Sequence, residues 1–497
     1  MTSKAKNKLS FSALYTVSQV LIVTILTAVL FGYVIRTEGI EVLGIWSLLL
    51  SFGSVSRLME MGLTGAITRF VATYNSQSTK ATVAKVISTA LVAVLIVMLV
   101  LMPIIYSLIS IFVHLIPIEI SESLLLSLIG YSLLGLSLVS LASILLSGLD
   151  GLELFGERTL IVISGQFIMT IVAILLLPAY GIFALVLGMI SQSVLTILLS
   201  IWRLCSSLNV NLLFVTKFDF IIFKEIFSYG STLLGTSVLM IFFEPVSKLL
   251  LLWFGGLSFV GFFELANQIV QKIRSLFVAA NQVLIPRFAT ASLNKNNDDK
   301  DLYRKVLELL FPIVLCTFSF IYVGRDFFAL VLIGDANETF NLILGICCLT
   351  WGFNTLTLPV YFYNIGVGKA YINFICFLMI SIINITMGLI LGGMFGLNGV
   401  LFSYAFSLAF GTSYLLLKMK VEKNESEHSI FSFSNSLLLF SLLVLIWTSS
   451  RISFFKYDWN LADFGLISFS ALFVIYVLFQ NPIIKRNINF LKKLELK

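Results

Sequence analysis

Two stretches of the sequence decide the fold: "GIEVLGIWSLLLSFGSVSRL" (Gly39–Leu58) and "GLSFVGFFELANQIVQKIRSL" (Gly256–Leu276). Aligning their central glycines also aligns Arg57 with Arg274. Later in the chain, "YGIFALVLG" from Tyr180 resembles "FGLNGVLFS" from Phe395. Both pairs are separated by about 216 residues, and a constant separation predicts two copies of one structural unit. The alternative is chance similarity between apolar segments.

The chain as a whole is strongly apolar. Of its 497 residues 59% are hydrophobic and 11% are charged, and its mean hydropathy is +1.04. Apolar runs long enough to cross a bilayer core of about 30 Å recur throughout, and lipid-exposed spans of this kind must be helical. We therefore predict an all-α polytopic membrane protein with about fourteen transmembrane helices. The predicted spans are residues 11–35, 40–63, 86–112, 123–147, 159–178, 181–202, 226–253, 257–285, 306–332, 340–363, 370–392, 396–418, 435–455 and 462–480.

The repeat divides these spans into two lobes of six helices. We expect residues 1–216 to form helices 1–6, residues 217–425 to form helices 7–12, and residues 426–497 to form a last helix pair with a basic cytoplasmic tail. Because six is even, the two copies have the same orientation in the membrane. This predicts a parallel pseudo-two-fold repeat around a central cavity, as transporters use.

Basic residues between the spans predict the orientation. The predicted inner segments hold 24 Lys and Arg residues, whereas the outer segments hold only Arg36, Arg451 and Lys456. By the positive-inside rule, both termini are cytoplasmic. The net charge of +7 follows from this asymmetry, and the scattered basic residues match no nucleic-acid-binding motif. We therefore expect no nucleic-acid partner.

Polar residues crowd into the predicted span 257–285. At 100° per residue most of them lie on or beside one line along the helix. A charge at mid-bilayer costs at least about 2.5–3.5 kcal/mol, so this face must meet water or protein partners. We expect it to line the cavity. Its residues are Glu264, Asn267, Gln268, Gln271, Lys272, Arg274 and Gln282.

Two arginines occupy equivalent positions in the repeat. Arg57 and Arg274, with Lys272 nearby, form a candidate cationic site, because guanidinium groups bind phosphate bidentately and keep their charge. Such a site suits a phosphate-bearing or otherwise anionic substrate. Alternatively, Arg57 pairs with Glu60, which lies three residues further along the same helix.

Glu244 and Lys248 lie four residues apart around Pro245. This spacing predicts an ion pair within one helix. The alternative is that Glu244 or Glu264 carries a proton or cation that drives transport.

Signals of enzymatic chemistry are weak. His114 and His428 are the only histidines, and neither has a candidate nucleophile nearby. The five cysteines lack metal-ligand spacing, and the chain has no P-loop. We expect no enzyme, no metal site and no cofactor.

Three segments resemble the bacterial polysaccharide transporter family: "RLMEMGLTGAITRFVATYNSQ" (Arg57–Gln77), "LLSGLDGLELFGERTL" (Leu145–Leu160) and "EPVSKLLLLWFGGLSFVGFFELANQI" (Glu244–Ile269). This family contains the O-antigen and capsule repeat-unit flippases of the multidrug/oligosaccharidyl-lipid/polysaccharide exporter superfamily. The resemblance implies translocation of an undecaprenyl-diphosphate-linked oligosaccharide across the bacterial inner membrane by alternating access. It also implies cooperation with a polysaccharide polymerase and chain-length machinery.

The resemblance assigns roles to the polar residues. Arg57, Arg274 and Lys272 would bind the diphosphate. The amides of Asn267, Gln268, Gln271 and Gln282 would bind sugar hydroxyls. A peptidoglycan lipid-precursor flippase, a multidrug or cation antiporter of the same superfamily, and a membrane-embedded glycan-processing enzyme are the alternatives.

Overall fold

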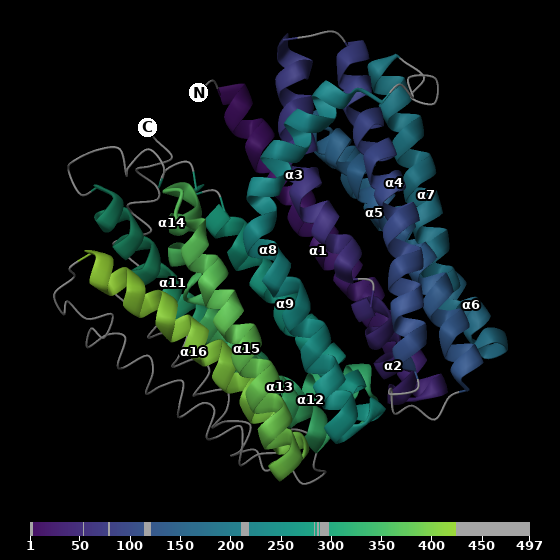
Figure 1. Cartoon of the computed structure of the whole chain (residues 1–497), viewed down its shortest axis with the longest axis vertical. Coiled ribbons are helices and arrows are strands. Elements are labelled where there is room, and N and C mark those ends of the chain that lie inside the picture. Colours follow the sequence, from purple (N-terminus) through teal and green to yellow (C-terminus); the bar gives the residue numbers. More distant parts are fainter. Residues whose placement is uncertain are drawn as a thin grey trace, which may run out of the picture. The chain divides into compact units, whose positions relative to one another are not determined.

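The computed structural model describes residues 3–52, 54–77, 80–113, 121–209, 218–282, 284–285, 288 and 298–423 (Figure 1). These residues are almost entirely helical and include no strand.

The chain forms two compact units, Met1–Gly261 and Phe262–Lys497. The first unit contains α1 (Ser3–Glu38), α2 (Ile40–Phe52), α3 (Ser54–Gln77), α4 (Lys80–Phe112), α5 (Glu122–Gly151), α6 (Phe155–Tyr180), α7 (Phe183–Leu208), α8 (Phe220–Gly255) and the start of α9 (Leu257–Gln282). The second contains the rest of α9 with α11 (Asp298–Val323), α12 (Arg325–Leu332), α13 (Glu338–Thr355), α14 (Leu358–Gly366), α15 (Ala370–Phe395) and α16 (Leu397–Lys423).

The structure contains membrane-spanning helices, as the apolar composition predicts. Within the described residues, nine helical segments are long and apolar enough to cross a membrane. The polar helix α9 is not among them. The last two predicted spans, residues 435–455 and 462–480, lie outside the described residues. The chain is therefore an all-helical, multi-pass membrane protein.

One predicted span and the loop after it are wrong in detail. Residues 40–63 form parts of two helices, α2 and α3, and α3 continues through the predicted loop as far as Gln77. The side chains of Ala66, Ile67 and Val71 are fully buried in the core of the first unit. These residues lie on one face of α3, whose other face is polar, so hydropathy alone does not detect this extension of the helix.

A second predicted span is also divided. Residues 306–332 belong to α11 and the short helix α12, with Gly324 between them. The Asp326 carboxylate, in the first turn of α12, accepts a hydrogen bond from Asn341 Nδ2 on α13 at 2.6 Å. Because Asp326 is buried, this bond satisfies an acidic group that would otherwise be costly to bury.

Two basic residues that the predicted orientation places on the cytoplasmic side join helices of the first unit. Arg158 on α6 forms an ion pair with Asp150 on α5 at 3.1 Å and donates a hydrogen bond to Gln19 on α1 at 2.9 Å. Arg203 on α7 forms a bidentate ion pair with Glu157 on α6. These contacts tie four helices together at one end.

Two helix pairs and two pairs of glycines agree with the predicted internal repeat. Helices α1 and α8 each have 36 residues, and α6 and α15 each have 26. Gly181 and Gly396, which follow α6 and α15, have nearly identical φ angles of 53° and 57°. Gly39 and Gly256, which precede α2 and α9, have φ angles of 91° and 88°. These helices and turns are therefore alike in both copies.

Helices α2 and α9 approach each other through their backbones. A Cβ atom added to Gly44 would overlap the carbonyl oxygen of Leu257, and one added to Gly261 would overlap that of Ile40. Leu257 and Gly261 are the repeat equivalents of Ile40 and Gly44, each 217 residues further along the chain. Each contact is thus the image of the other, as in an isologous interface. Only glycine permits so close an approach.

A polar contact accompanies this crossing. The Ser258 hydroxyl donates a hydrogen bond to the Glu41 carboxylate at 3.0 Å. These two residues are also repeat equivalents, 217 positions apart. The residues facing each other at this point are therefore the two copies of one position.

In the second unit, α15 and α16 run side by side, and α13 packs against α16 (Figure 1). Buried amides join the helices of this unit. Asn364 on α14 donates to Asn373 on α15 at 2.8 Å, and Asn373 donates in turn to the carbonyl oxygen of Tyr361 at 2.9 Å. Such bonds satisfy polar groups that neither lipid nor an apolar core could satisfy.

We predict that Gly44→Ala and Gly261→Ala each lower the thermal unfolding midpoint of the purified protein. Each added methyl group would meet a backbone oxygen, and such overpacking typically costs about 1–3 kcal/mol. Gly393→Ala is the matched control, because a Cβ atom at this position on α15 meets nothing within 4 Å. An unchanged midpoint in both crossing variants would contradict the close approach.

Candidate functional site

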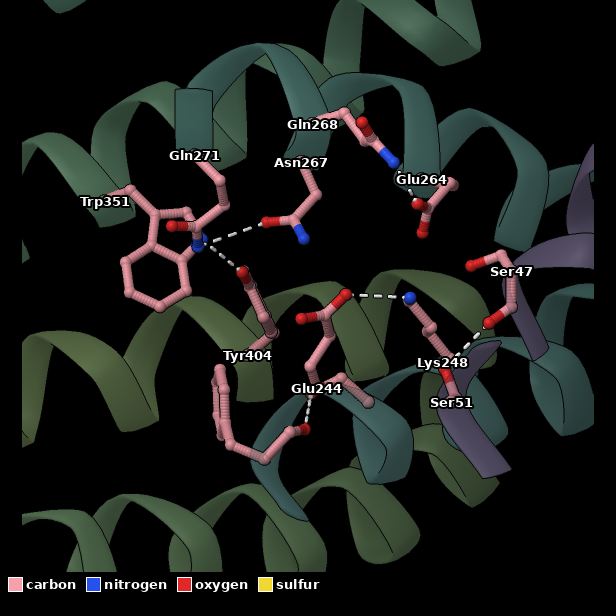
Figure 2. A network of polar contacts seen from close by, with 12 residues as sticks. Ser47, Ser51, Glu244, Lys248, Glu264, Asn267, Gln268, Gln271, Trp351 and Tyr404 are labelled. Carbon is pink, nitrogen blue, oxygen red and sulfur yellow. Dashed lines mark hydrogen bonds and ion pairs between the residues drawn. The ribbon is translucent and has the colours of Figure 1, made fainter. Parts of the chain in front are cut away.

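The polar face of α9 is organised by hydrogen bonds along the helix (Figure 2). Gln268 Nε2 donates to Glu264 at 2.7 Å, and Gln271 Nε2 lies 3.5 Å from Asn267 Oδ1. Both pairs have the four-residue spacing that brings side chains together on one helix face. Glu264 and Asn267 are buried, and the two glutamines are half-buried. The predicted polar stripe is therefore an ordered series of side chains in the folded chain.

Arg274 lies near the end of this face and contacts α13. Its Nη2 donates to Asn354 Oδ1 at 3.1 Å. Its guanidinium carbon lies 4.8 Å from the centre of the Trp351 ring, which is within the range of a cation–π interaction. One guanidinium group is thus held by an amide and an aromatic face from the same helix.

The residues that hold Arg274 are themselves anchored on α16. Trp351 Nε1 donates to the Tyr404 hydroxyl at 2.7 Å, a contact drawn in Figure 2. Asn354 Nδ2 donates to Thr412 Oγ1 at 3.2 Å. The Phe263 ring packs edge-on against Tyr404, with 5.3 Å between ring centres. Sequence reasoning missed this group, because it depends on contacts between residues far apart in the chain.

The charge of Arg274 is not balanced by a nearby acid in the part of the chain that the structure describes. No carboxylate among those residues lies within ion-pair distance of its guanidinium. Its Nε atom is buried and has no hydrogen-bond partner among them. A buried cation that lacks an anionic partner is costly unless an anion or water compensates it. Arg274 is therefore the strongest anion-binding candidate among the described side chains.

Lys272 and Gln282 are the remaining predicted members of the α9 face. Lys272 is half-buried, and its carbonyl oxygen accepts a hydrogen bond from the Ser275 hydroxyl at 2.6 Å. Gln282, at the last residue of the helix, is exposed. Asn281, which was not predicted, is buried, and its Oδ1 has no hydrogen-bond partner among the described residues. It lies seven residues after Arg274 and hence on the same face of α9.

Arg57 and Glu60 belong to α3, but their side chains lie outside the described residues. Their pairing, and the convergence of Arg57 with Arg274, stay predictions.

The predicted ion pair on α8 is present. Lys248 Nζ lies 2.7 Å from Glu244 Oε1, on either side of Pro245 (Figure 2). The Lys248 side chain is 4% exposed and that of Glu244 is 41% exposed. Buried hydroxyl groups of Ser47 and Ser51 lie on α2, which packs against α8 in the first unit. A buried ammonium with an adjacent carboxylate satisfies the usual requirement for a charge within a membrane helix.

A family described as polysaccharide biosynthesis protein matches residues 41–340, which is more than half of the chain. No curated protein sequence matches.

Several solved structures share the fold. An inward-facing multidrug resistance MATE family transporter of the MOP superfamily has a TM-score of 0.66 at 14% identity, over 83% of this chain and 98% of its own. The lipid II flippase MurJ, in an inward closed conformation, has a TM-score of 0.64 at 16% identity, over 95% and 99%. A MOP superfamily transporter from Pyrococcus furiosus, described as having a binding pocket of reverse polarity, has a TM-score of 0.51 at 15% identity, over 84% and 94%.

The family model matches more than half of the chain, and the structural matches cover nearly the full length of the solved transporters. The chain belongs to the polysaccharide biosynthesis protein family, and its fold is that of the transporters of the MOP superfamily.

Proposed function

We propose that this protein is a flippase that moves undecaprenyl-diphosphate-linked oligosaccharide repeat units, such as those of O-antigen or capsule, from the cytoplasmic to the outer leaflet. The observation that carries the proposal is the half-buried side chain of Arg274, whose Nε atom is buried and which has no carboxylate partner among the described residues. Membership of a polysaccharide biosynthesis family and the fold of a transporter support it.

The polar head group of the lipid-linked substrate is the main barrier to its translocation. The polyprenyl tail can stay in the bilayer, but a diphosphate and several sugars cannot cross bare hydrocarbon at an acceptable cost. In our proposal Arg274 neutralises part of the diphosphate charge, with Lys272 on the same helix and Arg57 from the equivalent position of the first repeat. Alternating access then exposes the bound head group to the opposite side.

The amide side chains suit the glycan part of such a substrate. Asn267, Gln268 and Gln271 can each donate and accept hydrogen bonds, and Gln282 is exposed at the end of the same helix. Neutral amides bind hydroxyl groups without requiring a particular charge or one sugar identity. We propose that they line the path of the sugars.

Location and partners follow from the same proposal. The protein would lie in the bacterial cytoplasmic membrane with both termini inside, in the lobes proposed above (residues 1–216 and 217–425). It would hand its substrate to a polymerase and chain-length machinery on the outer side.

Two transporter alternatives lead to different expectations. A cation antiporter needs an acidic coupling group, and residues Phe11–Ile35 of the first helix contain none. A peptidoglycan-precursor flippase would carry the same lipid diphosphate, and the fold matches both classes of transporter almost equally well. The fold therefore does not distinguish the two substrates, and a transport assay has to identify which glycan the protein carries.

We predict that the wild-type chain restores surface polysaccharide in a bacterium lacking its O-antigen flippase, and that Arg274→Ala does not. Loss of charge-assisted hydrogen bonds should lower the translocation rate roughly 10- to 100-fold, so lipid-linked repeat units should accumulate inside. Arg36→Ala is the matched control, because Arg36 is exposed at the end of α1. Membrane expression is matched by immunoblot.

Each outcome of that assay has one meaning. Rescue by Arg274→Ala at the wild-type level would remove Arg274 from the site and leave the flippase assignment. Rescue only in a strain depleted of its peptidoglycan-precursor flippase would reassign the substrate. Failure in both strains, with the protein present in the membrane, would overturn the flippase proposal.

The Glu244–Lys248 pair gives a separate prediction, because we propose that it stabilises α8 and does not couple transport to an ion. Glu244→Gln leaves the more deeply buried partner with a neutral amide, so it should lower the thermal midpoint more than Lys248→Met does. Transport per folded molecule, measured in vesicles with and without a pH gradient, should change little. A variant that folds normally but loses its response to the gradient would make Glu244 a coupling residue.

A further inference from the structure

Arg274 is held by two residues of α13. Trp351 and Asn354 lie three residues apart on α13, so they share one face of that helix. The guanidinium carbon lies over the Trp351 ring, and Asn354 accepts a hydrogen bond from Nη2. Two contacts from one helix thus hold the same guanidinium group.

The holding residues have little freedom of their own. Trp351 donates to Tyr404 and Asn354 donates to Thr412, and both acceptors belong to α16. All four side chains are buried, with exposures between 0% and 6%. A buried network in which every member is bonded fixes its geometry.

The network leaves one donor of the guanidinium group without a partner among the described residues. Asn354 uses Nη2, and Nε has no hydrogen-bond partner within the described residues. A neutral amide and a neutral aromatic ring orient the positive charge without cancelling it. This is the arrangement that binding an external anion requires, since a carboxylate at the same place would neutralise the cation.

The first repeat lacks the side chains that hold Arg274 in the second repeat. The positions equivalent to Trp351 and Asn354, 216 residues earlier, are Gly135 and Leu138. The position equivalent to Tyr404, 215 residues earlier, is Met189, and the Met189 side chain packs directly against Gly135. The contact between the two positions is thus retained in both repeats, but only the second pair carries hydrogen-bonding aromatic groups.

We infer that Trp351 and Asn354 are positioning residues that hold Arg274 as a fixed anion-binding group, and that the two arginines of the repeat are therefore not equivalent. The anion is a phosphate group of the lipid-linked substrate, an identity that rests on the proposed function. Arg274 provides the oriented contact, whereas Arg57 has no such pair at the equivalent positions of its own repeat.

The most informative variant is Asn354→Asp. Aspartate has nearly the same shape, can accept from Arg274, and can accept a hydrogen bond from the Thr412 hydroxyl in place of the bond that Asn354 donates. Beside an arginine it stays ionised and neutralises the guanidinium. If Arg274 does not contact the anion, this variant would bind as the wild type does. If Asn354 is the neutral partner that orients Arg274 for an anion, the variant should keep the thermal midpoint and weaken anion binding roughly 10- to 100-fold.

Variants of Trp351 test the second contact. Trp351→Phe keeps an aromatic face and should bind within a few-fold of the wild type, while Trp351→Leu should bind roughly 10- to 30-fold more weakly. Trp202→Leu is the matched control, because Trp202 on α7 is 68% exposed.

The measurement is the affinity of the full chain in nanodiscs for undecaprenyl diphosphate, with undecaprenol as the uncharged reference and thermal unfolding as the check on folding. Wild-type binding with the losses given above, together with loss in Arg274→Gln, supports the inference. If Arg274→Gln loses affinity while Asn354→Asp and Trp351→Leu bind as the wild type does, the positioning roles are wrong and the flippase proposal stands. If the wild type does not prefer the diphosphate to undecaprenol, the phosphate site and the proposed function both fail.

Discussion

The close contact between the backbones of α2 and the start of α9 is the tightest constraint on where α9 begins. Two glycines, Gly44 and Gly261, permit a helix crossing that any side chain at these positions would block. The crossing fixes where α9 begins, and the helical period then determines which of its later residues share a face. Arg274 lies thirteen residues after Gly261, so its position on α9 is set by this contact and by the pitch of one helix.

The two copies of the repeat share features of their scaffold but differ in side chains. The lengths of two helix pairs, the glycines beside them, and the contact between positions 135 and 189 or 351 and 404 recur in both copies. The residues at these last positions differ: glycine and methionine in the first copy, tryptophan and tyrosine in the second. Packing tightly limits the combined volume of two facing side chains. It limits their functional groups less. Duplication can therefore keep a fold while one copy acquires a binding group.

The sequence predicted what depends on period and composition. Apolar length predicted the membrane helices, and the spacing of polar residues predicted the face of α9 with its hydrogen bonds from Gln268 to Glu264. It could not predict Trp351, Asn354, Tyr404 and Thr412, because their roles arise where three helices meet. Nor did hydropathy predict the extension of α3 to Gln77, since the buried residues of that segment occupy one side of an otherwise polar helix. Local pattern specifies elements, and packing between elements specifies partners.

The hydrogen bond between Glu41 and Ser258 bears on how such a protein could arise. In a dimer made of two identical halves, a residue on the symmetry axis faces its own copy, so a glutamate there would face a second glutamate. Two carboxylates at that separation repel each other and resist being ionised together. Once both halves are encoded by one gene, the two copies of the position can mutate independently. An acid opposite a hydroxyl group is a solution that a fused chain can reach and a homodimer cannot.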